Sequence, residues 1–217
     1  MREQDMNLKK VVKEQLQERI NTRNRKRLLN KTPSIICSNC TGGFLYHWLG
    51  LEFRSPFINL YMTPGDFVTA LEHFEEFMQT DFEEIQIQGL DYPVGRGVYD
   101  TQIHFMHYKN FAEAQTAWSR RKARLDVRNM GIMLANLGGG EEQYGILERF
   151  EQLPFKHKVA FTDRAYPEMK SIFRLNGYDC RKAKNGNVYA TQKLNGMRYI
   201  DQFDYVEWLN HLKEEIH

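Results

Sequence analysis

Beyond Pro33 the chain alternates short apolar runs with longer segments in which apolar residues recur at helical spacing. Short apolar runs are typical of buried strands and the longer pattern is typical of amphipathic helices, so the alternation favours an α/β fold. We therefore expect a three-layer α/β sandwich with a mostly parallel or mixed central sheet, built as one domain over residues 32–217. The expected strands cover residues 34–38, 57–61, 84–88, 101–107, 130–134 and 158–161.

The clearest helix signal lies at Thr63. This residue type is a favourable N-cap, Pro64 suits the first helical position, and Asp66 stands three residues after the cap. Apolar residues from Phe67 to Met78 then recur on one face, which predicts core packing. The other expected elements are helices over residues 111–125, 141–153 and 199–212, and a hairpin or long loop over 176–196.

The run SIICSNCTGGFLYHWLG, which starts at Ser34, predicts a strand, a polar glycine turn and a helix. Such a junction lies at the carboxyl end of a strand, where free N–H groups and the helix dipole favour an anionic ligand. The run is neither G-x-G-x-x-G nor G-x-x-x-x-G-K-[ST], so a purely structural glycine turn is an equal alternative. Three further glycines, residues 138–140, predict a second anion-binding turn or a hinge. The ligand-binding residues assigned to the first turn are Asn39, Thr41, Gly42 and Gly43.

Composition indicates a single core and no membrane span. The 217 residues are 41% hydrophobic, and no stretch approaches the roughly 18 apolar residues of a transmembrane helix. The first residues lack the apolar core of a signal peptide, so we expect a cytoplasmic protein. The three cysteines are an odd set, and Cys37 and Cys40 form a C-x-x-C that leaves zinc or redox chemistry open. No second cysteine pair follows, so we assign no metal and no cofactor.

The net charge of +2 conceals an asymmetry along the chain. Residues 1–31 hold ten Lys and Arg against four Asp and Glu, so this end carries +6 and the remainder −4. Leu8, Val11, Val12, Leu16 and Ile20 recur at helical spacing there, which predicts a basic amphipathic helix. The helix could pack on its own domain, lie on an anionic membrane or bind nucleic acid. We expect no nucleic acid partner, because the body has no basic stripe with interleaved aromatics, and we assign the membrane contact to residues 8–27.

Several side chains near expected strand ends have the chemistry of a catalytic or phosphate-binding site. His107, three residues after His104, is the candidate general base, with a structural histidine as the alternative. Asp163 follows an expected strand, and Asp204 lies among aromatic residues that could stack on a sugar; either could instead cap a turn or helix. The candidate phosphate ligands are Arg120, Arg121 and Lys158.

Eight ordered stretches over residues 33–210 resemble a bacterial family of unassigned molecular function. Its members are labelled exopolysaccharide biosynthesis proteins and are encoded in surface-polysaccharide clusters. The resemblance implies an α/β fold and a role in capsule, exopolysaccharide or lipopolysaccharide assembly. Family members have an aromatic residue where this chain has Thr41, and an acidic stretch where it has residues 136–139, so no metal ligand is transferred. The stretches are SIICSNCTGG, SPFINLYMTPGDF, YPVG, IHFMHYK, AWSRRKAR, LPFKHKVAFT, YPEMKS and YIDQFDYVEWLN.

The leading hypothesis is a transferase that acts on an activated sugar or a lipid-linked glycan intermediate at the inner membrane face. In this hypothesis the glycine turn and the basic residues hold phosphate, while His107, Asp163 or Asp204 supplies a base or hydroxyl contacts. The alternative is a non-catalytic binding or scaffold protein of a polysaccharide assembly system. The absence of a recognised catalytic motif favours that alternative.

Overall fold

The main sheet has four parallel strands in the order β1-β5-β6-β7. The computed structural model describes residues 2–135, 142–180, 187–190 and 196–213, and its side chains from residue 10 onward, apart from that of residue 142. The predicted α/β class with a mostly parallel sheet is confirmed, and three of the strands fall where the apolar runs predicted them. The strands are β1 (Ser34–Cys37), β5 (Met130–Leu134), β6 (Lys158–Thr162) and β7 (Ile172–Arg174).

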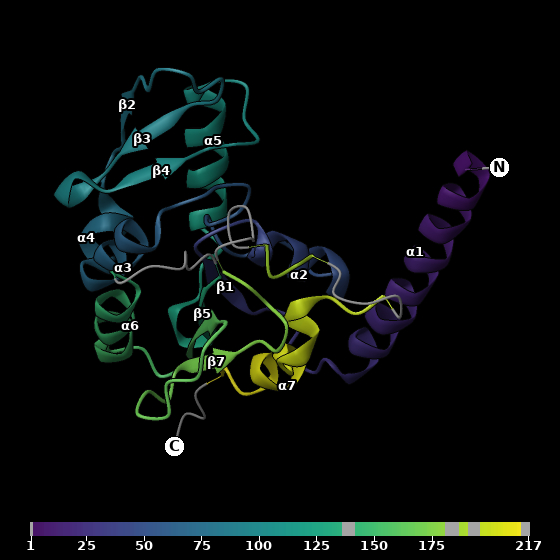
Figure 1. Ribbon diagram of the computed structural model, residues 1–217. Helices are drawn as coiled ribbons and strands as arrows, with labels where there is room; N and C mark the ends of the chain where they lie inside the picture. Colours follow the sequence, from purple (N-terminus) through teal and green to yellow (C-terminus); the bar gives the residue numbers. More distant parts are fainter. Residues whose placement is uncertain (1, 136–141, 181–186, 191–195, 214–217) are drawn as a thin grey trace.

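A second, antiparallel sheet is inserted between β1 and β5 and lies in the upper part of Figure 1. The expected strand over residues 57–61 does not form, because Asn59 has a positive φ of 62° that interrupts the extended backbone. Only Tyr61 pairs there, through two backbone hydrogen bonds of 2.9 and 2.8 Å with His104. The strands of this sheet are β2 (Glu83–Ile85), β3 (Val94–Arg96) and β4 (Gln102–His104).

Each face of the main sheet is covered by its own apolar cluster, which produces the expected three layers. Ile36, Ile132 and Ala160 face the cluster with α3, α5 and α6, whereas the alternate residues face α2 and α7. This division follows from the alternation of side chains along a strand. The helices are α2 (Thr41–Leu49), α3 (Pro64–Glu72), α4 (Phe74–Gln79), α5 (Phe111–Lys122), α6 (Glu142–Gln152) and α7 (Tyr205–Asn210).

The predicted start of α3 is confirmed. Thr63 Oγ1 accepts a hydrogen bond of 3.1 Å from the N–H of Asp66, and Pro64 occupies the first turn. The expected long helix divides at His73, whose φ and ψ of −118° and 38° are not helical, so α3 and α4 are separate. The predicted triple glycine lies outside the described residues, as does most of the glycine-rich segment after residue 180.

The amino-terminal helix α1 (Arg2–Arg27) attaches to the body by its last turns, and its first turns project away from it (Figure 1). Asn24 Nδ2 donates to Tyr205 Oη at 2.8 Å, and Arg198 Nη2 donates to Asn21 Oδ1 at 2.9 Å. The helix is therefore held to the body by buried polar groups. Val11, on the predicted apolar face, is 42% exposed. In the part of the chain that is described, no helix is long and apolar enough to cross a membrane.

Candidate functional site

The carboxyl ends of β1, β5 and β6 meet at one edge of the main sheet, the usual place for ligands in parallel α/β sheets. Side chains tie the first two ends together. Ser38 Oγ accepts from the N–H of Ala135 at 3.0 Å, and Asn39 Nδ2 donates to the Ala135 carbonyl at 3.3 Å. Asn39 Oδ1 also accepts from the N–H of Thr41 at 3.0 Å. Asn39 therefore fixes the junction where β1 turns into α2.

The two predicted turn glycines lie inside the first turn of α2, because the helix begins at Thr41. A Cβ added at Gly42 would stand 2.8 Å from the Cβ of Cys37, so this glycine allows α2 to pack directly on β1. At Gly43 a Cβ would meet Ile58 Cγ2 at 3.6 Å, an ordinary contact distance. The geometry gives Gly42 a packing role, which is the alternative that the sequence left open.

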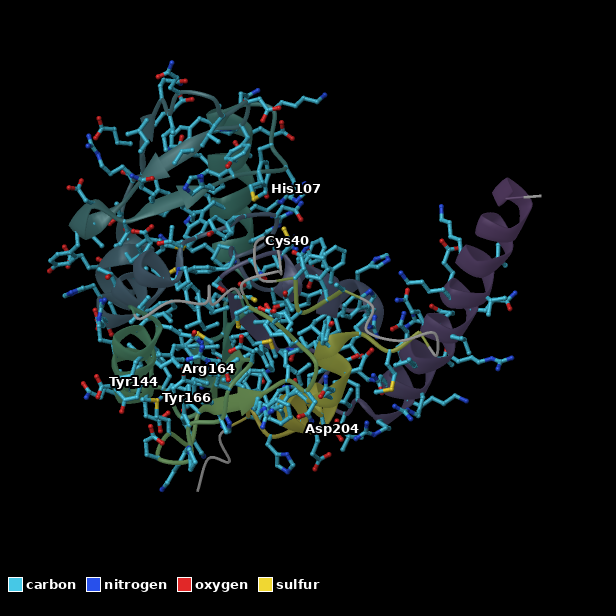
Figure 2. All side chains as sticks on the ribbon, viewed as in Figure 1. Cys40, His107, Tyr144, Arg164, Tyr166 and Asp204 are labelled. Carbon is cyan, nitrogen blue, oxygen red and sulfur yellow. The ribbon has the colours of Figure 1, made fainter. Side chains whose placement is uncertain are left out.

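Cys40, the N-cap residue of α2, brings its thiol next to the imidazole of His107. The Sγ to Nε2 distance is 3.3 Å, and Figure 2 shows the two side chains adjacent. His107 lies in the turn after β4, whereas the sequence had extended the strand to this residue. Cys40 is partly exposed, and burial raises the pKa of its thiol. The structure thus places a thiol beside the predicted base, His107, and in the sequence this cysteine stands out only as half of a C-x-x-C.

A buried arginine holds the segment that carries His107. Arg121 Nη1 donates to the carbonyl of Ile58 at 3.3 Å and to the hydroxyl of Tyr108, the residue after His107. The hydroxyl of Tyr108 reaches the same carbonyl at 3.3 Å. Arg121 is 8% exposed, and its guanidinium lies 5.4 Å from the ring centroid of Phe53. The guanidinium predicted to bind phosphate is therefore engaged in internal contacts, from which it positions the turn of His107.

Asp163, directly after β6, is the second candidate residue at this edge. Its Oδ2 accepts from the N–H of Cys180 at 3.2 Å, while its buried Oδ1 has no hydrogen-bond partner among the described residues and lies 4.0 Å from Arg164 Nε. Burial and the nearby Asp163 carboxylate raise the pKa of Cys180 to about 11. Tyr144 and Tyr166, with ring centroids 6.0 Å apart, lie near Arg164 in Figure 2. This end of the edge combines a carboxylate, a guanidinium and two phenol rings.

The remaining predicted residues are not brought to the Cys40–His107 pair. Lys158 lies at the amino end of β6, where its Nζ donates to the Leu153 carbonyl at 2.6 Å and burial lowers its pKa. Asp204 is the N-cap of α7 and forms an ion pair with Arg27 of α1. Arg120 is exposed in the last turn of α5. The predicted set is thus divided among separate parts of the fold.

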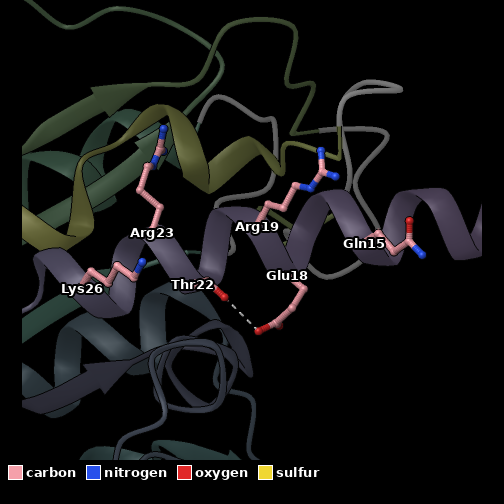
Figure 3. Close-up of a pocket in the computed structure, with 6 residues that line it drawn as sticks. All are labelled: Gln15, Glu18, Arg19, Thr22, Arg23 and Lys26. Atoms are coloured by element: carbon pink, nitrogen blue, oxygen red, sulfur yellow. Dashed lines mark hydrogen bonds between the residues drawn. The ribbon is translucent and has the colours of Figure 1, made fainter.

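Two further features concern metal and anion binding. Within the described ranges, no group of three or more His, Cys, Asp or Glu side chains is placed to hold a metal ion. Along α1, a groove of about 670 Å³ has three cationic side chains and one carboxylate on its wall (Figure 3). It lies inside the segment predicted to touch the membrane. Its described lining residues are Gln15, Glu18, Arg19, Thr22, Arg23 and Lys26.

Comparison with known proteins places the candidate site inside a recognised domain. Residues 11–210 match the family model described as a domain of unknown function (DUF1919). The chain belongs to this family. It is also 38% identical over 192 residues to an uncharacterized protein of Haemophilus influenzae (strain ATCC 51907 / DSM 11121 / KW20 / Rd), with 88% of this chain and 91% of the relative covered. Cys40, His107 and Asp163 all lie within the DUF1919 domain.

Proposed function

We propose that this DUF1919 protein is a transferase of surface or exopolysaccharide biosynthesis, acting on an activated sugar or a lipid-linked glycan intermediate. The observation that carries the proposal is the contact between Cys40 and His107 at the same sheet edge where Asp163 lies. A base beside an ionisable thiol, and a carboxylate at the end of another strand of the same edge, are groups that group-transfer enzymes use to activate and orient reactants. A scaffold protein has no need of this combination.

The end of β6 offers chemistry that suits a phosphorylated sugar. The Asp163 carboxylate lies 4.0 Å from the Arg164 guanidinium, which is exposed and can bind a phosphate. Tyr144 and Tyr166 provide ring faces on which an apolar sugar face can stack. The polysaccharide role itself is supported by the resemblance of residues 33–210 to exopolysaccharide biosynthesis proteins.

A position at the cytoplasmic face of the inner membrane completes the proposal. The first half of α1 projects from the body and presents Val11 and Val12, 42% and 45% exposed, between Lys10 and Lys13. Apolar side chains flanked by cations favour contact with anionic lipid. This segment would bring the sheet edge to lipid-linked intermediates.

The test measures ligand-induced thermal stabilisation against nucleotide sugars, free nucleotides and polyprenyl phosphate analogues. Ligand at a hundredfold its Kd stabilises by about 2.7 kcal/mol, which raises Tm by roughly 5–10 °C in a domain of this size. We expect a selective shift that is lost in Asp163→Asn and retained in His47→Gln, a control at an exposed histidine of α2.

The same variants should be followed in cells. A folded His107→Gln, Asp163→Asn double variant is expected to abolish polysaccharide output while the protein persists. Normal output from the folded double variant, together with no thermal shift across the panel, would contradict the transferase proposal and indicate a non-catalytic scaffold.

A further inference from the structure

The chain's three cysteines, all within the described residues, occupy very different environments. Cys37 is fully buried in β1, with the pKa of its thiol raised to about 12 by burial. Cys180 is buried and close to the Asp163 carboxylate. Cys40 is partly exposed and has an imidazole nitrogen 3.3 Å from its sulfur. Cys40 is therefore the thiol that is both accessible to solvent and next to a proton acceptor.

The surroundings of Cys40 suit a nucleophile that is activated only when it reacts. Burial raises the pKa of its thiol and so favours the protonated form. Nε2 of His107 lies within hydrogen-bonding distance and can take that proton. The thiolate is then formed at the amino end of the nine-residue helix α2, where the helix dipole favours negative charge.

Three neighbouring features define the surroundings of Cys40. Thr41, directly after Cys40, is fully buried, and its Oγ1 has no hydrogen-bond partner in the described part of the structure. Tyr189 is half-buried close to Cys40 and packs on Phe44 with ring centroids 4.6 Å apart. The N–H of Gly42 is engaged by the buried Cys37 thiol, whereas the N–H of Gly43 has no acceptor within the helix, and such a group can stabilise an oxyanion.

We propose that Cys40 is a covalent nucleophile and His107 its general base in an acyl transfer from an ester or thioester donor to a sugar hydroxyl. This choice of acceptor rests on the proposed function. Nε2 of His107 takes the thiol proton, and the sulfur attacks the donor's carbonyl carbon. The bond from that carbon to the donor's leaving oxygen or sulfur breaks, and the leaving group takes the proton from His107. The product is a thioester on Cys40.

The second half returns the enzyme to its starting state. The acceptor hydroxyl gives its proton to His107 as its oxygen attacks the thioester carbonyl. The carbon–sulfur bond breaks, the sugar ester is released, and the Cys40 sulfur regains the proton from His107. No oxidant, reductant or metal is required, because both steps exchange one acyl bond for another.

The experiment treats the full chain with p-nitrophenyl acetate and follows p-nitrophenolate release by stopped flow. We expect a burst of one equivalent per chain, with intact mass and peptide mapping placing one acetyl group on Cys40; Cys37 and Cys180 serve as unmodified internal controls. Cys40→Ala should abolish the burst. His107→Gln should slow it about 100-fold or more, whereas His47→Gln should leave it unchanged. Addition of glucose should speed loss of the acetyl group.

Thermal unfolding of each variant shows whether a lost burst is due to the missing side chain or to a protein that no longer folds. Acetylation of a residue other than Cys40 would contradict the proposal that Cys40 is the nucleophile. A burst in folded His107→Gln that is as fast as in the wild-type protein would contradict the role of His107 as its base. His107-dependent acetylation of Cys40 with normal polysaccharide in cells would retain the nucleophile and remove the polysaccharide role. If His107→Gln cells lose polysaccharide but the wild-type protein is not acetylated, the polysaccharide role is retained and the proposed nucleophile is removed.

Discussion

Alanine at Gly42 and alanine at Gly43 should have opposite effects on stability. Both residues lie in the first turn of α2, so each substitution gains helix propensity. The two substitutions differ in what the added Cβ contacts. At position 42 the new Cβ would lie 2.8 Å from Cys37 Cβ, and at position 43 it would lie 3.6 Å from Ile58 Cγ2. The Cys37 Cβ is fixed by the β1 backbone and cannot rotate away. The start of α2 must therefore move off the sheet in Gly42→Ala, and it need not move in Gly43→Ala.

The magnitude follows from two opposing effects. Replacing glycine by alanine in a helix gains up to about 1 kcal/mol, whereas overpacking costs about 1–3 kcal/mol. Gly42→Ala is expected to lose about 1–2 kcal/mol net, and Gly43→Ala to gain up to about 1 kcal/mol. Since helix propensity is common to both, a difference of about 2 kcal/mol would separate their Tm values by roughly 4–8 °C.

Urea unfolding followed by tryptophan fluorescence measures this difference, and calorimetry gives the Tm values. The rate at which iodoacetamide alkylates Cys40 is a second readout, because displacement of α2 moves the thiol away from His107. If Gly42→Ala is as stable as Gly43→Ala, the packing argument is wrong. A stable Gly42→Ala that no longer binds a nucleotide sugar would instead favour the anion-binding interpretation of the glycine turn.

Three other perturbations test the fold. Arg198→Met should lower the free energy of unfolding by about 3–5 kcal/mol, because it leaves the buried Asp201 carboxylate without its ion-pair partner. Denaturant unfolding measures this loss. Gly131→Ala should lower Tm, since its Cβ would overlap the indole ring of Trp208 in α7. The hydrogen bond from Arg149 lowers the pKa of Glu72. Glu72→Gln should therefore be less stable than the natural protein by about 0.2–1 kcal/mol near neutral pH. This difference should disappear as the pH falls through the lowered pKa, because Glu72 is then protonated in both the folded and unfolded chain.

Each of these has an outcome that contradicts it. A change under 1 kcal/mol in Arg198→Met would show that the guanidinium is dispensable to the body, and Arg198→Lys tests whether charge alone suffices. An unchanged Tm in Gly131→Ala would mean that α7 can shift freely. A Glu72→Gln deficit that is independent of pH would show that the ion pair is not its source.

The sequence by itself predicted those elements that depend on residues close together along the chain. The apolar runs that became β1, β5 and β6 were found because each is buried on both faces and needs no partner to be recognised. The cap at Thr63 was found for a similar reason, since its hydrogen bond spans only three residues. The three-residue strands β3 and β7 were missed because so short a segment is extended only when a neighbour pairs with it.

Only the tertiary structure decided the candidate site. Cys40 and His107 are 67 residues apart. They meet because Tyr61 pairs with His104 at the end of β4, while the next residue, Met62, donates its N–H to the Ser38 carbonyl just after β1. Arg121 has the sequence features of a surface cation, yet the fold buries it over Phe53. Spacing along a chain fixes which residues share a face of one element. Which faces are buried, and which side chains touch across elements, depends on packing between segments that are distant in sequence.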